Sequence, residues 1–133
     1  MSLNAYLWIA VGSALGGVTR VWASVWLARR LGETFPWGTL FVNVTGSFLI
    51  GLFFASTASV DRAIIGPTLR QFFMLGLCGG YTTFSSFSLE TLSLFRTGEI
   101  ARAGCNIALS IALCLFAVWA GFALGSARAG GGA

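Results

Sequence analysis

The chain has 133 residues, of which 56% are hydrophobic and 9% are charged, and its mean hydropathy is +0.85. A soluble globular domain carries about a quarter charged residues, so this composition excludes an ordinary cytosolic enzyme and a disordered chain. Eight arginines against four acidic residues give a net charge of +4, but their scatter excludes a nucleic-acid-binding stripe. His and Lys are absent, which removes His-based and Schiff-base catalysis. We therefore predict a small protein of the lipid bilayer that is not an enzyme and does not bind nucleic acid.

Four apolar segments of the chain are long enough to cross a bilayer, which takes about 20 predominantly apolar residues. They cover roughly residues 3–28, 37–58, 68–95 and 100–125. The short connections between them carry seven of the twelve charged side chains. Because four crossings use most of the chain, we predict one all-α transmembrane domain over residues 1–126, followed by a flexible C-terminal tail over residues 127–133.

The arginines are nearly balanced between the two sides of this predicted bundle. One side carries Arg62, Arg70 and Arg128. The other side carries Arg29, Arg30, Arg96 and Arg102, and Arg20 lies nearer to this side. Orientation follows the excess of basic residues in cytoplasmic connections, and an excess of one or two residues is weak. Two interpretations stay open: a single orientation fixed by other features, and a dual topology in which copies insert both ways, which the near-balance favours.

Glycines spaced four residues apart predict how the helices pack. The pattern occurs three times, at Gly12 and Gly16, at Gly76 and Gly80, and at Gly121 and Gly125. Small residues at this spacing let two helix backbones approach closely in lipid. We therefore expect each pair to lie in a helix contact.

Polar residues inside the apolar segments are the candidates for function. Arg20 lies inside the first segment, where an ionised side chain is costly; it either serves a function or extends to the membrane surface near Arg29. Asn43 stands in the second segment, with Thr39 one turn earlier on the same face. Its side chain either joins two helices by a hydrogen bond or offers its two amide donors to an anion that sheds water.

The third segment is unusual in its second half, CGGYTTFSSFSLE, which has two glycines and six Ser, Thr and Tyr residues. Adjacent Gly79 and Gly80 predict a break in the helix, which lipid tolerates only where the backbone is buried in protein or lines a polar cavity. The carbonyls freed by a break can bind a cation. Phe84 and Phe87 share a helix face, and the positive edge of an aromatic ring can face an anion.

These motifs resemble the Fluc/CrcB family of fluoride channels over nearly the whole chain. The family's Gly-rich first helix ending in Arg is matched by GSALGGVTR, its second-helix motif by PWGTLFVNVTG and its third-helix motif by GGYTTFSSFSLE. The resemblance implies a subunit of four transmembrane helices, the third broken near the membrane centre, that assembles as an antiparallel, dual-topology homodimer with two pores. It also implies a multi-pass protein of the bacterial inner membrane.

The resemblance further implies which residues line the fluoride pore. The family's pore asparagine falls on Asn43, next to Thr39, and its paired phenylalanines fall on Phe84 and Phe87. The polar track of the third helix falls on Thr83, Ser85, Ser86, Ser88 and Glu90. On the fourth helix the matching positions are Asn106, Ser110 and Cys114, of which only the serine keeps the family's residue type. Arg20 takes a structural position at a vestibule.

The resemblance also implies a structural Na⁺ at the centre of the dimer. Its ligands would be the backbone carbonyls of Gly79 and Thr82 from each subunit. The chain has no carboxylate between Asp61 and Glu90, and a neutral oxygen cage suits a monovalent cation better than a divalent one. We expect this Na⁺ to be a fixed part of the dimer.

The function implied by the resemblance is passive, selective export of fluoride from the cytoplasm, which protects against fluoride toxicity. One alternative is a small dual-topology, proton-coupled multidrug transporter, which also has four helices. Such a transporter needs an intramembrane carboxylate in its first helix, and this first helix has none. A third class, a scaffold or assembly subunit that transports nothing, would not need a hydroxyl-rich broken helix.

Overall fold

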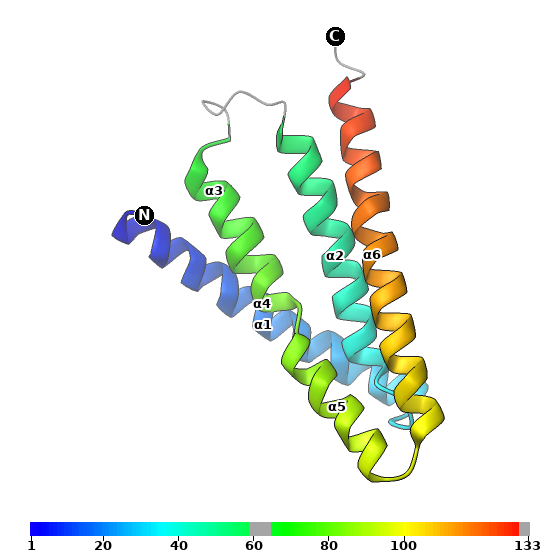
Figure 1. The fold of residues 1–133 in the computed structure, drawn as a ribbon. Helices are drawn as coiled ribbons and strands as arrows, with labels where there is room; N and C mark the ends of the chain where they lie inside the picture. The colour runs from blue at the N-terminus through cyan, green and yellow to red at the C-terminus, as the bar shows by residue number, and fades with distance from the viewer. Residues whose placement is uncertain (59–64, 131–133) are drawn as a thin grey trace.

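The computed structural model describes residues 1–58 and 65–130, and this part of the chain is helical apart from short connections (Figure 1). The elements are α1 (Leu3–Leu31), α2 (Trp37–Ala58), α3 (Pro67–Gln71), the π-helical segment η1 (Phe72–Cys78), α4 (Gly79–Tyr81), α5 (Phe84–Arg96) and α6 (Ile100–Gly130). Residues 59–64, which include Arg62 of the charge count, and residues 131–133 lie outside the described residues. Over the described ranges the all-α prediction is confirmed.

The helix ends lie close to the predicted ones. α2 has the predicted bounds, α1 runs on to Leu31, and the third predicted segment is divided among α3, η1, α4 and α5. α1 begins where the Ser2 hydroxyl accepts from the Ala5 N–H (3.3 Å) and ends at Gly32, whose φ of 84° favours glycine. Residues 127–130, which the sequence assigns to the tail, form the last turn of α6.

The third segment as a whole, residues 67–96, packs less extensively against α2 and α6 than these two helices pack against each other. Helices α2 and α6 run side by side along most of their lengths, while α1 crosses obliquely behind the other elements (Figure 1). The two helices meet closely at three glycines, Gly51 of α2 and Gly121 and Gly125 of α6. A β-carbon at any of them would collide with the backbone of the other helix.

The contact between α1 and the third segment is also made through glycines. Gly12 and Gly16 of α1 lie against the backbone of residues 72–81, and Gly76 and Gly80 lie against residues 9–13 of α1. A β-carbon at each of these positions would come closer to a backbone atom than side chains normally do. All three glycine patterns therefore form helix contacts, as the sequence predicts.

The third segment is interrupted at Thr82 and Thr83, not at the two glycines. Gly79 has helical angles (φ −63°, ψ −37°), whereas Thr82 (φ −85°, ψ 157°) and Thr83 (φ −151°, ψ 110°) are extended. Gly80 is needed for close packing against α1, since the Ser13 backbone of α1 occupies the place where a side chain at position 80 would be. The prediction of a break at the glycines is therefore wrong in position, because those glycines serve close packing.

Within the described residues, two helices are long and apolar enough to cross a membrane, Trp37–Ala58 and Ile100–Arg128. Large apolar side chains also cover much of the outer surface; Trp22, Leu115 and Trp119 are each exposed over about two thirds of their area. Water would not tolerate so large an apolar surface, whereas lipid would. Composition, helix length and surface together indicate a membrane protein.

Gly16→Ala and Gly17→Ala form a matched pair that tests the packing of α1. A β-carbon at Gly16 would collide with the Leu77 carbonyl, whereas one at Gly17 meets nothing within 4 Å. We expect Gly16→Ala to lower the free energy of unfolding by about 1–3 kcal/mol through overpacking. Gly17→Ala should leave it unchanged or raise it by up to about 1 kcal/mol, since Ala favours a helix. Thermal unfolding in detergent measures both, and equal midpoints would contradict the contact.

Candidate functional site

Asn43 closes the interruption of the third segment. Its Nδ2 donates to the Thr83 carbonyl (3.0 Å), and its Oδ1 accepts from the Thr83 N–H (2.7 Å). The side-chain amide thus pairs with both backbone groups of Thr83, as a neighbouring strand would, where the helical hydrogen bonds end. Of the two alternatives for Asn43, the bond that joins two helices is present. Nδ2 also carries a second proton, which can serve another acceptor.

Thr83 begins α5 as its N-cap residue. Its hydroxyl accepts from the Ser86 N–H (3.2 Å), donates to Ser86 Oγ (3.0 Å) and lies 3.3 Å from Ser85 Oγ. A side-chain oxygen at this position satisfies one of the free N–H groups of the first helical turn. The hydroxyl-rich motif therefore starts a new helix directly after the interruption and gathers three hydroxyls at its first turn.

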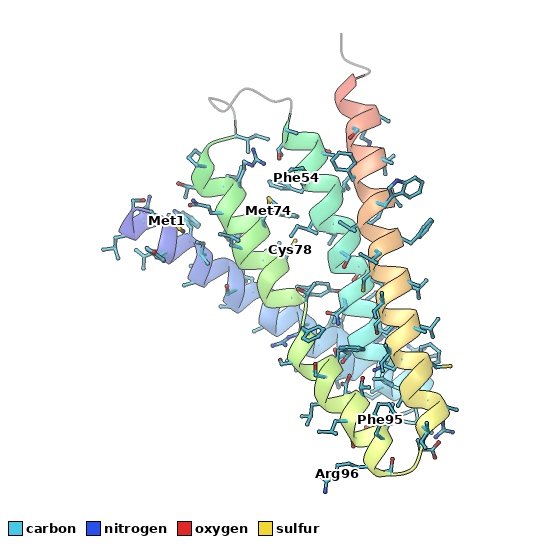
Figure 2. All side chains as sticks on the ribbon, in the orientation of Figure 1. Met1, Phe54, Met74, Cys78, Phe95 and Arg96 are labelled. Atoms are coloured by element: carbon cyan, nitrogen blue, oxygen red, sulfur yellow. The ribbon has the colours of Figure 1, made fainter. Side chains whose placement is uncertain are left out.

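A cavity of about 430 Å³, which we name the break cavity, lies against the interruption and is lined from α2, α6 and the third segment. Phe84 and Phe87 line it with rings whose centroids lie 5.4 Å apart at a tilt of 46°. Phe84 is 78% exposed, whereas Phe87 is half-buried. Met74 and Cys78 also line this cavity, and Figure 2 shows both on the side of the third segment that faces α2. The rest of the polar lining comes from Asn43, Ser47, Thr82, Thr83 and Ser110.

A second cavity of about 260 Å³, the arginine cavity, lies between α1, α2 and α5. Arg20, Thr39 and Glu90 line it, and the Thr39 hydroxyl donates to Glu90 Oε1 (2.7 Å). Arg20 Nε and Glu90 Oε2 are buried there without a hydrogen-bond partner among the described residues. Buried polar atoms normally have partners, so this cavity keeps one donor and one acceptor for a small molecule or ion.

The cavities form a series, because neighbouring ones share lining residues. Thr83 belongs to both the break cavity and the arginine cavity. Ser24, Thr39 and Glu90 belong to both the arginine cavity and a third cavity of about 380 Å³ at the connection between α1 and α2. Polar groups therefore follow one another from the α1–α2 connection to the interruption.

The structure brings most of the predicted pore residues to this series. Asn43, Thr83, Phe84, Phe87 and Ser110 line the break cavity, and Arg20, Thr39, Thr83, Ser86 and Glu90 line the arginine cavity. The remaining predicted residues line none of the three cavities: Ser85 and Ser88 are exposed, and Asn106 is buried. Cys114 of α6 does line the break cavity, at a position where the family pattern has a hydroxyl.

Two serines of the site were not among the sequence candidates. Ser24 of α1 lines two of the three cavities, and Ser47 of α2 lines the break cavity. The signal for Ser24 is its place as the one hydroxyl in the apolar run VWASVWLA. Ser47 stands four residues after Asn43 and so shares its helix face.

The interruption also changes the backbone groups proposed for a cation. In a continuous helix the Thr83 N–H would donate to the Gly79 carbonyl, but here it donates to Asn43 Oδ1. The extended angles of Thr82 likewise turn its carbonyl out of the helical direction. Gly79 and Thr82 both line the break cavity. Neutral carbonyl oxygens that have lost their helical donors are suitable ligands for Na⁺. The carbonyls of Gly79 and Thr82 therefore fit the cation that the sequence suggests.

Fold and site together define a class: helical membrane proteins whose polar groups gather around an interrupted helix. Residues 7–122 match the family model described as CrcB-like protein, Camphor Resistance (CrcB). The chain belongs to the CrcB family.

Similar proteins from three bacteria carry the name fluoride-specific ion channel FluC. The chain is 58% identical to the protein of Methylocella silvestris, over 87% of this chain and 88% of the relative. It is 56% identical to the protein of Opitutus terrae, over 90% of each chain. It is 50% identical to the protein of Rhodospirillum rubrum, over 87% of this chain and 90% of the relative.

Asn43→Leu tests the closure of the interruption, because leucine keeps the volume of the side chain and removes both hydrogen bonds. We expect the Thr83 amide to exchange its hydrogen faster, by roughly tenfold or more, since an unpaired buried donor costs about 1–3 kcal/mol. Ser47→Ala is the control, because it removes a hydroxyl from the same cavity and leaves the Asn43–Thr83 pair intact. Hydrogen exchange followed by mass spectrometry measures both variants. Unchanged exchange at Thr83 in Asn43→Leu would show that the pair does not hold the interruption.

Proposed function

We propose that the protein is a fluoride-selective channel that lets fluoride leave the cytoplasm passively. The observation that carries the proposal is the break cavity, where the Asn43 amide and the paired rings of Phe84 and Phe87 meet beside an interrupted helix. Relatives at 50–58% identity named as fluoride-specific channels support the same conclusion. They favour it over a proton-coupled multidrug transporter, and α1 has no carboxylate for such coupling.

Conduction of fluoride requires groups that replace its strongly held water. The second Nδ2 proton of Asn43 is a neutral donor in the break cavity. The hydroxyls of Thr83 and Ser110 also line it; they donate to Ser86 Oγ and Asn106 Oδ1 in this structure and would turn from these acceptors to an entering anion. The ring edges of Phe84 and Phe87 add weak positive charge without a cation that would trap the ion. A conducting pore must bind the ion well enough to admit it and weakly enough to release it, and such a neutral lining meets both demands.

The path that we propose for fluoride follows the series of cavities. An anion would move between the break cavity and the arginine cavity at Thr83, which lines both. Arg20 then acts in the arginine cavity as a vestibule cation, with its buried Nε as the donor. Thr39 holds Glu90 Oε1 by a hydrogen bond and so fixes one side of the carboxyl group.

The same proposal includes the assembly and its membrane setting. We propose four transmembrane crossings, made by α1, α2, the interrupted third segment and α6, in a multi-pass protein of the bacterial inner membrane. The near-balanced arginines support insertion in both orientations. The exposure of Phe84 supports an antiparallel homodimer, since a pore ring needs a second wall and the partner subunit would provide it. Each dimer would then contain two pores.

The carbonyls of Gly79 and Thr82 are our proposed ligands for a central Na⁺. Two subunits related by a twofold axis would supply four carbonyls, and such a neutral cage suits a monovalent cation. The ion supplies a positive charge at the dimer centre. Two features of the chain support this proposal. The Thr83 N–H donates to Asn43 Oδ1 and so leaves the Gly79 carbonyl without its helical donor, and the extended angles of Thr82 turn its carbonyl out of the helical direction.

Fluoride efflux from liposomes, followed with an ion-selective electrode, tests the function directly. We expect the wild-type protein to release fluoride rapidly and to release chloride far more slowly. We expect Phe84→Ile and Phe87→Ile to reduce fluoride efflux by roughly tenfold each, because Ile keeps the bulk and removes the ring edge. A tenfold reduction corresponds to a rise of about 1.4 kcal/mol in the free-energy barrier to conduction. Wild-type rates in both variants would show that the rings only pack. No fluoride release by the wild-type protein would overturn the proposed function.

Replacement of Na⁺ by a large organic cation tests the structural cation. After the replacement we expect fluoride efflux to decline over time as the bound ion is lost. In a separate measurement with Na⁺ on both sides, we expect that radiolabelled Na⁺ does not cross the membrane with fluoride. A lower thermal midpoint in Na⁺-free detergent would accompany the loss, because a ligand that binds only the folded dimer stabilises it. Stoichiometric movement of Na⁺ with fluoride would contradict a fixed cation.

A further inference from the structure

Helix α5, which carries both pore phenylalanines, has few attachments to the rest of the subunit. Among the described elements it packs against α2 and α6 only. In lipid the hydrophobic effect does not hold helices together, so van der Waals packing and hydrogen bonds between helices decide where a helix sits. The position of the Phe84 and Phe87 rings therefore depends on a small number of polar contacts.

Among the described residues, three residue pairs join α5 and its N-cap to other helices by side-chain hydrogen bonds. Thr83 is held by Asn43 of α2, and Glu90 is held by Thr39 of α2. The third contact joins α5 to α6: Asn106 Nδ2 donates to Thr91 Oγ1 at 2.9 Å. The first two belong to the cavities described above, whereas Asn106 lines none of them.

The contact at Asn106 is the most completely buried of the three. Asn106 is 1% exposed, Thr91 is 7% exposed and Ser110 is 8% exposed. Both ends of the Asn106 amide are engaged, because Ser110 Oγ donates to its Oδ1 at a long 3.5 Å. Asn43 is likewise bonded at both ends of its amide, but it lines the break cavity, whereas Asn106 lines none of the three cavities and is therefore the poorer candidate for an ion ligand.

Thr91 connects Asn106 to the backbone of Phe87, one of the two pore phenylalanines. Its hydroxyl has one proton, which it donates to the Phe87 carbonyl of the preceding turn at 2.7 Å. Because that proton is used, Thr91 Oγ1 can only accept from Asn106, and the chain runs in one direction, from α6 through Thr91 to the backbone of Phe87. Consecutive hydrogen bonds of this kind strengthen one another in a low-dielectric interior.

We propose that Asn106 is a positioning residue for the Phe87 ring, acting through Thr91, and not a residue of the fluoride path. The inference rests on the proposed channel function, since it assigns Asn106 a role in the same site. It gives a physical reason for an asparagine at this position, where the chain departs from the family pattern. Through this contact α6 fixes the turn of α5 that carries Phe87, whose ring lines the break cavity.

Two variants remove the contact from either side. Asn106→Leu keeps a similar volume without the donor, and Thr91→Val keeps the shape of the side chain without the hydroxyl. We expect each to reduce fluoride efflux by roughly tenfold, within the range for coupled neighbours. If Asn106 acts through Thr91, the double variant is no slower than the slower single variant, whereas independent effects would multiply.

Two further variants separate positioning from general destabilisation. Thr91→Ser restores the hydroxyl and should regain most of the wild-type efflux. Thr57→Val is the matched control, because Thr57 is equally buried (4%) and its hydroxyl donates to the Phe53 carbonyl one turn back in α2 (2.8 Å). We expect Thr57→Val to conduct at close to the wild-type rate. Equal losses in Thr57→Val and Thr91→Val would overturn the proposal.

Hydrogen exchange keeps this inference distinct from the proposed function. We expect Asn106→Leu to speed exchange at the amides of residues 87–95 in α5, and to leave residues 40–55 of α2 unchanged. If the wild-type protein conducts fluoride and Asn106→Leu conducts equally well, the positioning role is overturned and the channel function stands. If the wild-type protein does not conduct fluoride, the channel function fails, and unchanged exchange in α5 would overturn the positioning role as well.

Discussion

The pairing of the Asn43 side chain with the backbone of Thr83 is the interaction on which the rest of the site depends. A bilayer offers no water to backbone groups, so a helix cannot open within it unless the protein supplies new partners. Asn43 supplies both a donor and an acceptor at the point of opening. The opening then allows Thr83 to cap a second helix, and that helix presents Phe84 and Phe87 to the break cavity. One amide from α2 thus determines the direction of two aromatic side chains on another element.

The fold was predictable where local rules decide it. α2 has the predicted bounds because Pro36 precedes it and the run after it is uninterrupted and apolar. The glycine patterns also led to the correct helix contacts, since only small residues allow two backbones so close. The position of the interruption was not predictable in the same way. Glycine suits a break and a close contact equally well, and the residue that decides between them, Asn43, lies 40 positions from Thr83 in the sequence.

The site shows the same division between local and distant information. Spacing correctly grouped Asn43 with Thr39 and Phe84 with Phe87, because residues three or four apart share a helix face. Spacing did not separate Ser86, which lines the arginine cavity, from Ser85 and Ser88, which are exposed. That distinction depends on where α1 and α2 lie around α5. Asn106 illustrates it further, since its partner Thr91 is known only once α5 and α6 are packed together.

Because Thr83 lines both the break cavity and the arginine cavity, two fluoride ions on the proposed path would affect each other's binding. The Thr83 hydroxyl has a single proton, which it donates to Ser86 Oγ in this structure. To bind an anion it would have to turn away from Ser86, and it could then donate in the break cavity or in the arginine cavity but not in both. On the proposed path, an anion in one cavity would therefore withdraw this donor from the other, and by thermodynamic reciprocity each anion would weaken the binding of its neighbour. Two adjoining sites that disfavour double occupancy release their ions readily, which a row of independent donors would not achieve.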